Sequence, residues 1–531
     1  MILKEYMVPM RDGTKLYTRV ILPKEEGAWP VSFSRSPYDA RDFVLDENDP
    51  EISSFIAAGY ALVHQSCRGT ARSEGFFAPF ETEREDGLDA LQWIREQPFY
   101  NGEIYVHGGS YGSYVHMAYL PDHPEGVKGA MLWIMPPRMD EGMHVHDMLK
   151  QDILLPWYIQ QYHKNQTDTA AIMADFPALA LKRPLYKAIS RYHEGGCPES
   201  EALTRDGLGG AAWMKQPGAG DAREAFRTLE IPILIIEGWY DIYIGNGRSM
   251  WEDLSPETKA KSAMLMGPWP HKCGLVDPDW DLELPDGELA PGAKLNWFNH
   301  IRTGEPLAFA EEGRVKYYTI GAGTWHSVPA LPEVEAQQAL YLNQAGGMAF
   351  VPGDMAEMTY AYDPENPTRF ECGSNAFCTV KRGVRVDEVC RYGQDVLTFT
   401  TAPLEEDITI TGEIGVALHV RSDCEDTAFF LRLEALVGGK WLPVQETIST
   451  LRRCCPDYVP GTEAVVTMQT APTAWRFAKG SQLRAHVASA SFPTYPAHGN
   501  TAVPVQEQVE TKVAHNTVLL GKSQEIGRAH V

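Results

Sequence analysis

The chain has 531 residues, of which 44% are hydrophobic and 22% are charged, and its formal net charge at pH 7 is −24. A chain of this length exceeds what one hydrophobic core usually serves, so we expect two or three domains. The acidic balance argues against nucleic acid or an anionic membrane surface as a partner. No uncharged apolar run approaches transmembrane length.

The N-terminus and the cysteines bear on compartment and metal binding. The first six residues contain no apolar region before a small-residue cleavage site, so we expect a cytoplasmic protein. The nine cysteines are an odd number without CxxC spacing, which predicts neither a disulfide framework nor a zinc site. The adjacent Cys454 and Cys455 are expected to be free thiols. We therefore expect no metal and no cofactor.

Taken in chain order, the first 135 residues alternate between strand-like and helix-like segments. An Asp-Gly pair between two alternating apolar runs predicts an N-terminal β-hairpin. An amphipathic helix is expected over residues 83–97. Such alternation favours a mostly parallel sheet covered on both faces, with an active site at the carboxyl ends of its strands. Strands are expected at residues 31–36, 60–65, 104–106 and 127–134.

The sequence Gly-Gly-Ser-Tyr-Gly at residues 108–112 follows one of these strands and precedes a helix expected to begin near Tyr114. A serine at the apex of a strand, a sharp turn and a helix forms a nucleophile elbow, and the glycines let neighbouring backbone pass closely. The helix N-terminus would direct N–H groups towards an oxyanion. Taken alone, the motif fits an ordinary Gly-Ser loop equally well.

Residues 136–223 lose the strand pattern and look helical, for example at 149–158 and 172–176. We interpret them as a cap over the catalytic face, with an ordinary helical subdomain as the alternative. The sheet then resumes at 231–241 and ends with a final core strand at 263–271. Asp241 and His271 stand at the ends of these two strands, in the chain order Ser, Asp, His of an α/β-hydrolase. Either residue alone could be a helix cap or a surface side chain.

Beyond about residue 312, many short β-type runs separated by turn residues indicate an all-β sandwich. We expect this domain to form a structural wall of the cleft, with carbohydrate binding as the alternative. Representative runs lie at 315–320, 338–342, 396–400, 408–412, 414–420, 428–436 and 482–487.

Together these motifs resemble the cocaine esterase-like (CocE/NonD) hydrolases, which are related to the X-Pro dipeptidyl-peptidases of the serine peptidase S15 group. The resemblance covers nearly the whole chain. It implies an α/β-hydrolase catalytic domain with a helical cap insertion, plus a C-terminal all-β jelly-roll sandwich. It rests on residues 11–13, 36–38, 68–75, 108–112, 238–241 and 267–269 with His271.

The expected domain division follows from the same patterns. The last seven residues resemble the translation of a common sequencing-adapter oligonucleotide, so we treat them as a non-native tail and exclude them from fold reasoning. The α/β-hydrolase domain takes residues 1–135 and 224–311, the cap 136–223, the jelly roll 312–524 and the tail 525–531.

The resemblance also implies roles for five residues. Ser110 would be the nucleophile, His271 the general base and then acid, and Asp241 the group that orients the imidazole. The phenol of Tyr38 and the backbone N–H of Tyr111 would bind the oxyanion. The sequence departs from the common family pattern at residues 65–67, where an acidic residue is expected, and at position 71, where alanine replaces a usual glycine. Both departures concern loop contacts.

The leading functional hypothesis is a serine hydrolase of a small-molecule ester, with amides and short peptides as further substrates. The alternative is an X-Pro dipeptidyl aminopeptidase or α-amino-acid ester hydrolase, in which acidic cap residues bind the substrate amine. Those candidates are Asp140, Glu141, Asp147 and Asp152, for which a solvated cap face is the simpler explanation. A non-catalytic ligand-binding protein using the β domain is the hypothesis of a different class. A homo-oligomer is compatible with the sequence, which leaves the oligomeric state open.

Overall fold

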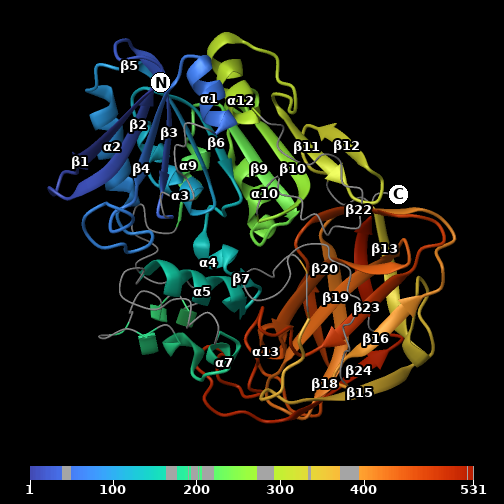
Figure 1. Cartoon of the computed structure of the whole chain (residues 1–531). Coiled ribbons are helices and arrows are strands. Elements are labelled where there is room, and N and C mark those ends of the chain that lie inside the picture. Colours follow the sequence, from blue (N-terminus) through green and yellow to red (C-terminus); the bar gives the residue numbers. More distant parts are fainter. Residues whose placement is uncertain are drawn as a thin grey trace.

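A computed structural model gives the fold in two large parts, each built on one sheet (Figure 1). Within the residues described, one sheet has ten strands and the other has eleven. None of the helices described is long and apolar enough to span a membrane. The described residues are 1–38, 49–162, 176–188, 190–192, 196, 201–202, 204–205, 221–271, 292–332, 336–370, 373, 394–522 and 524–529.

The first sheet begins with the expected hairpin, whose two strands pair antiparallel. From β4 to β11 every neighbouring pair of strands is parallel, so their carboxyl ends lie at one edge. Its order is β1 (Ile2–Pro9), β2 (Lys15–Leu22), β4 (Ala61–Ser66), β3 (Trp29–Ser36), β5 (Tyr100–Gly109), β6 (Val127–Trp133), β9 (Ile233–Tyr240), β10 (Ala263–Pro270), β11 (Arg314–Thr319) and β12 (Thr324–Val328).

The centre of this sheet is buried on both faces, which explains the unbroken apolar run at residues 233–236 of β9. In β9 the side chains of Ile233 and Ile235 belong to one hydrophobic cluster, whereas Leu234 and Ile236 belong to another on the opposite face. Helices supply the covering residues. They are α1 (Pro50–Ala57), α2 (Glu83–Arg95), α3 (Tyr111–Met117), α9 (Arg223–Arg227), α10 (Ile244–Asp253), α11 (Pro256–Lys259) and α12 (Ala293–Thr303).

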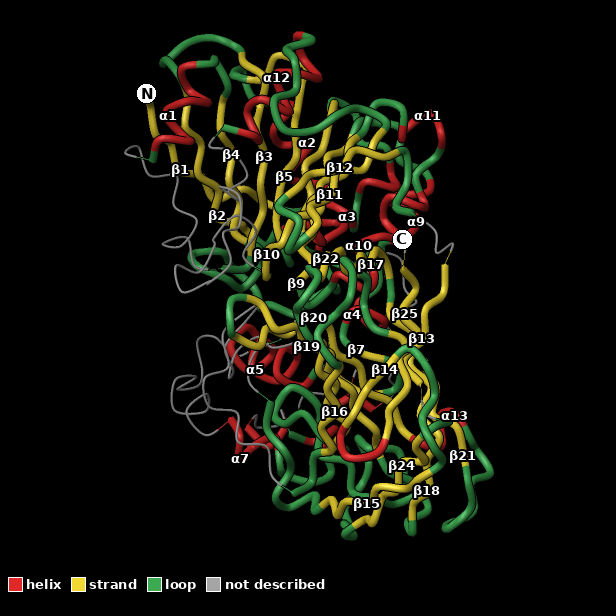
Figure 2. The backbone as a smooth tube through the Cα atoms, turned by 90° about the vertical axis from the view of Figure 1, so that its right-hand side faces the viewer, coloured by secondary structure: helices red, strands yellow, loops and turns green. Residues whose placement is uncertain are grey.

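The cap leaves the sheet after β6 and lies beside the β domain (Figures 1 and 2). The helix expected over 149–158 is α5 (Gln151–Tyr162), and a short hairpin of β7 (His144–Val145) and β8 (Met148–Leu149) precedes it. The helix expected at 172–176 lies outside the described residues except for its last position, where α7 (Phe176–Ala180) begins. The remaining described cap elements are α4 (Met139–Gly142), η2 (Leu185–Lys187) and η3 (Ser190–Tyr192).

The second sheet belongs to the expected all-β domain. Strand β18 shows the alternation of apolar and polar residues by which such strands can be predicted from the sequence. Its residues alternate between buried and half-buried along the whole strand. The strands are β13 (Ala336–Asn343), β14 (Gly347–Ala349), β15 (Ala356–Tyr362), β16 (Leu397–Thr401), β18 (Ile414–Ser422), β19 (Ala428–Val437), β20 (Lys440–Thr450), β21 (Ala464–Gln469), β23 (Leu483–Ala488), β24 (Ala514–Leu520) and β25 (Gln524–Ala529), with a separate pair β17 (Ile408–Gly412) and β22 (Thr473–Phe477), and one short helix, α13 (Leu451–Cys454).

Two expectations need correction. The run at 315–320 was assigned to the β domain, but most of it is β11, which pairs parallel with β10 in the first sheet. The strand at 263–271 is therefore not the last of that sheet. A short apolar strand carries no local mark of the sheet it joins, so the sequence could not assign it. The second concerns the tail that was excluded from fold reasoning, because its residues 525–529 lie in strand β25. The backbone of β25 pairs with β13 and β18.

Candidate active site

Ser110 occupies a strained turn between β5 and α3. Its φ of 53° and ψ of −131° are unusual for a residue with a side chain. A Cβ at Gly108 would lie 2.0 Å from the Gly112 carbonyl oxygen, and one at Gly109 would lie 2.0 Å from the Trp133 indole nitrogen. Both positions therefore require glycine. This is the geometry of a nucleophile elbow, with the helix beginning at Tyr111 rather than near Tyr114.

Ser110, His271 and Asp241 form a continuous line of hydrogen bonds. The His271 Nε2 atom lies 3.0 Å from Ser110 Oγ, and its Nδ1 atom lies 2.7 Å from Asp241 Oδ2. Asp241 is fully buried and His271 is 9% exposed. The second oxygen of Asp241 accepts a 2.7 Å hydrogen bond from the Tyr243 N–H. Both carboxylate oxygens thus have donors, as a buried anion requires.

Tyr38 follows β3, and its phenol lies beside the elbow. The Trp157 indole N–H, from cap helix α5, donates a 3.3 Å hydrogen bond to the Tyr38 phenol oxygen. Burial raises the pKa of the Tyr38 phenol, while hydrogen bonds with Trp157, Ser110 and the Tyr111 N–H oppose that shift. A neutral phenol next to Ser110 and the Tyr111 N–H keeps its proton available for donation to an oxyanion.

The Tyr111 side chain is held by hydrogen bonds with buried polar groups. The Tyr111 phenol donates a 3.0 Å hydrogen bond to Glu83 Oε1 and accepts one of 2.7 Å from the Phe80 N–H. The Arg35 guanidinium donates to the other oxygen of Glu83 at 3.2 Å. Gln65, at one of the departures from the family pattern, accepts a 2.9 Å hydrogen bond from Arg35. Gln65 therefore belongs to the hydrogen-bond network that supports the elbow at Tyr111. It does not contact Ser110, His271 or Asp241 in the hydrogen bonds given above.

Other motif residues do not join the site. The Arg68 guanidinium contacts Asp12 at 2.7 Å and Asp86 at 2.6 Å, so it ties the N-terminal hairpin to α2. Ala71, which stands at a usual glycine position, has a φ of 50°. A side chain in this left-handed region typically costs about 1–2 kcal/mol, so glycine would be less strained than alanine at this position.

The acidic cap residues have structural contacts. Asp147 accepts a 3.2 Å hydrogen bond from the Thr450 N–H of the β domain. Asp152 is fully buried, so the solvated face expected for it is wrong. Glu141 pairs with Arg138 at 2.7 Å. The side chain of Asp140 lies outside the described residues.

Sequence reasoning missed two aromatic residues at the site. Trp157 orients Tyr38 and lies over the Tyr111 ring, with centroids 5.3 Å apart. Tyr243 meets the His271 ring edge-on at a centroid distance of 5.4 Å. For Tyr243, its position two residues beyond Asp241 could have indicated a place at the site. The sequence around Trp157 contained no such indication.

The fold and this arrangement define a serine hydrolase of the α/β type. Two family models match the chain: the X-Pro dipeptidyl-peptidase (S15 family) over residues 12–273 and the X-Pro dipeptidyl-peptidase C-terminal non-catalytic domain over residues 308–526. The chain therefore belongs to the X-Pro dipeptidyl-peptidase (S15) family.

Individual relatives agree with this assignment. Cocaine esterase of Rhodococcus sp. (strain MB1 Bresler) is 25% identical, with 95% of this chain and 93% of that protein covered. A solved α-amino acid ester hydrolase superposes with a TM-score of 0.81 at 21% identity, covering 99% of this chain and 96% of that one. A CocE/NonD family hydrolase from Staphylococcus aureus gives a TM-score of 0.68 at 17% identity, covering 100% and 94%. These solved structures establish the α/β-hydrolase fold.

If the Tyr38 phenol is an oxyanion donor, as the sequence predicts, replacing it with phenylalanine should lower kcat about 100- to 1000-fold while the ring remains in place. The measurement is steady-state hydrolysis of p-nitrophenyl butyrate. Tyr6→Phe, in the N-terminal hairpin, is the matched control and should behave as wild type. Equal kcat values for both variants would show that the Tyr38 phenol does not stabilise the oxyanion.

Proposed function

We propose that the protein hydrolyses carboxylic esters through an acyl-enzyme on Ser110. The observation that carries this proposal is the pair of hydrogen bonds joining Ser110 to His271 at 3.0 Å and His271 to Asp241 at 2.7 Å. Serine hydroxyls are weak nucleophiles until an adjacent base takes the proton, and this geometry supplies the base. Ser110, His271 and Asp241 then form a catalytic triad.

In the first step, Ser110 Oγ attacks the ester carbonyl while His271 Nε2 takes the hydroxyl proton. The negative charge develops on the carbonyl oxygen between the Tyr38 phenol and the Tyr111 N–H. His271 then gives its proton to the departing alcohol, and the acyl-enzyme remains. In the second step, His271 takes a proton from the water that attacks the acyl group. The bond between the acyl carbon and Ser110 Oγ then breaks, His271 returns the proton to Oγ, and the carboxylic acid leaves. Asp241 holds the imidazole throughout and stabilises its charged form.

We retain the division into hydrolase domain, cap and C-terminal jelly roll as a proposal, with the start of the jelly roll moved beyond β12 (Thr324–Val328). The jelly roll acts as a wall of the cleft. Contacts between Asp147 of the cap and Thr450 of the β domain support that role. The cytoplasmic location and the exclusion of nucleic-acid partners stay predictions of the sequence, which leaves the oligomeric state open.

Ester preference can be tested by comparing p-nitrophenyl butyrate with Ala-Pro-p-nitroanilide. We expect the ester to be turned over with the larger kcat/KM, because Asp147 and Asp152 of the cap are engaged or buried within the protein. The comparison should be made with wild type and with Ser110→Ala as the blank for each substrate. A larger kcat/KM for the dipeptide anilide would establish the aminopeptidase alternative instead.

A further inference from the structure

Lys150 is a buried cationic side chain that links the cap to the active-site loop. Its residue is 4% exposed, and its ammonium donates hydrogen bonds to the Gly142 carbonyl at 3.1 Å and to the Ile242 carbonyl at 2.5 Å. Gly142 belongs to cap helix α4, whereas Ile242 directly follows Asp241. One ammonium group therefore joins two parts of the chain that are distant in sequence.

The Ile242 carbonyl lies within a tight turn built by Asp241. The Asp241 carboxylate accepts from the Tyr243 N–H at 2.7 Å, and the Asp241 carbonyl accepts from the Ile244 N–H at 3.2 Å. These bonds enclose Ile242, so an ammonium group on its carbonyl restrains the whole turn. The turn contacts His271 twice, through the Asp241 carboxylate and through the Tyr243 ring.

The charge of Lys150 faces that of Asp241. Burial lowers the pKa of the Lys150 ammonium to about 8, although the charges of Asp241 and Glu446 oppose the shift. At neutral pH the group is thus mostly charged. The charged ammonium donates more strongly to the Gly142 and Ile242 carbonyls than a neutral amine would.

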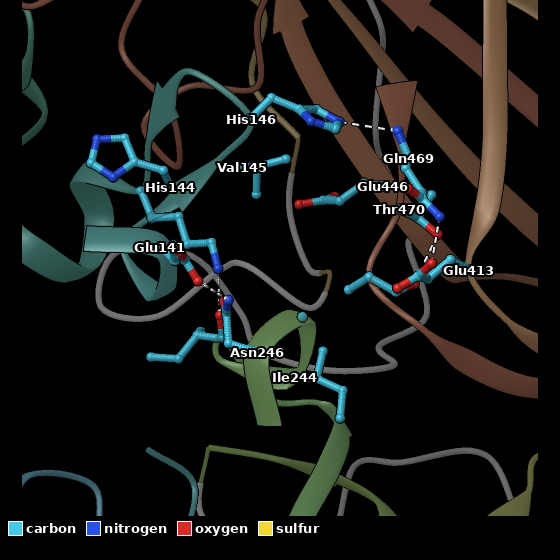
Figure 3. Close-up of a pocket in the computed structure, with 14 residues that line it drawn as sticks. Glu141, His144, Val145, His146, Ile244, Asn246, Glu413, Glu446, Gln469 and Thr470 are labelled. Carbon is cyan, nitrogen blue, oxygen red and sulfur yellow. Dashed lines mark hydrogen bonds between the residues drawn. The ribbon is translucent and has the colours of Figure 1, made fainter. Parts of the chain in front are cut away.

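The other ionisable groups around Lys150 line a cavity of ≈ 230 Å³ between the cap, α10 and the β domain. Figure 3 shows the carboxylates of Glu141 and Glu446 reaching into this cavity from the cap and from β20. His144 and His146 also line it. Glu446 is held by Arg432 at 2.6 Å, and Glu141 is held by Arg138 at 2.7 Å. Asp241 additionally faces the buried Glu237.

We propose that Lys150 is a positioning residue for the Asp241 and His271 pair, because its ammonium holds the turn that carries Asp241 and Tyr243 against the cap. This inference rests on the function proposed above. It adds a structural reason for the cap to be present even when it does not touch substrate, because the cap supplies the ammonium group.

The test compares Lys150→Met with Lys182→Met, an exposed cap lysine that serves as the matched control. We expect Lys150→Met to lower kcat roughly ten- to a hundredfold with KM unchanged, because the Asp241 turn loses its restraint. Lys182→Met should match wild type in both respects.

A second pair of variants separates charge from packing and remains informative if the methionine variant does not fold. Lys150→Arg keeps the charge, and the adjoining cavity leaves room for the larger group, whereas Lys150→Gln keeps a donor without the charge. The arginine variant should recover most of the wild-type kcat, because a charged donor still reaches the two carbonyls, whereas the glutamine variant should stay about as slow as Lys150→Met. Equal kcat values in the arginine and glutamine variants would overturn the proposal.

Labelling by a fluorophosphonate probe distinguishes this failure from failure of the proposed function. If the proposed function is wrong, the probe will not label Ser110 in the wild-type protein. If only the inference about Lys150 is wrong, wild type and both variants will be labelled at Ser110 with equal rates.

Discussion

Replacing Ser110 with alanine should lower kcat/KM for p-nitrophenyl butyrate by about a million-fold, the loss found when the nucleophile of such a triad is removed. The reason is that the His271 Nε2 atom lies 3.0 Å from Ser110 Oγ, so this hydroxyl is the one that the imidazole can activate. Steady-state release of p-nitrophenol measures the effect. Ser54→Ala, in α1 on the hydrolase domain, is the control and should retain wild-type kinetics.

Folding of the Ser110→Ala variant should be unaffected, because alanine also carries a Cβ and leaves the strain of this turn as it is. Ser110 has a φ of 53°, and strain at such sites is common where function requires it. Thermal unfolding of the two proteins therefore separates a catalytic effect from a folding defect. An alanine variant that melts like wild type and hydrolyses a panel of activated esters equally fast would contradict the proposed acyl-enzyme.

Replacing Asp241 with asparagine should lower kcat about 10⁴-fold. Asp241 uses both oxygens as acceptors, one for the Tyr243 N–H and one for His271 Nδ1. Asparagine has only one carbonyl oxygen, so its amide group must face one of these two donors. If it faces His271, the imidazole is driven to the wrong tautomer. If it faces Tyr243, the turn loses its hydrogen bond.

The Asp241→Asn effect is measured as kcat across the pH range, with Asp253→Asn as the control. Asp253 pairs with Arg227 on the surface at 3.3 Å and should be neutral to catalysis. A loss smaller than about tenfold in the Asp241 variant would show that the imidazole is oriented by another group.

The sequence could place Ser110, Asp241 and His271 near one another because each follows an apolar strand. In a parallel sheet those strand ends share one edge, so a pattern along the chain becomes proximity in space. The elbow was predictable from the Gly-Gly-Ser-Tyr-Gly motif taken together with Asp241 and His271. The structure adds the reason for the glycines, because a Cβ at Gly108 or Gly109 would lie too close to backbone or indole atoms. The hydrolase fold and the all-β domain followed from the same strand patterns.

Contacts between distant segments could not be predicted in the same way. Trp157 reaches Tyr38 from a cap helix, and nothing in the local sequence of α5 marks it as different from a core aromatic residue. Lys150 and Ile242 meet only because the cap folds back on the loop after β9. The strand at 315–320 was assigned to the wrong sheet because strand propensity does not specify a pairing partner.

The most direct test of the proposed acyl transfer is reaction with a fluorophosphonate probe followed by mass analysis of the labelled peptide. The proposal predicts a single adduct on Ser110, loss of ester hydrolysis in proportion to labelling, and no adduct in Ser110→Ala. An active protein that carries no adduct on Ser110, or an adduct on a different serine that abolishes activity, would contradict it.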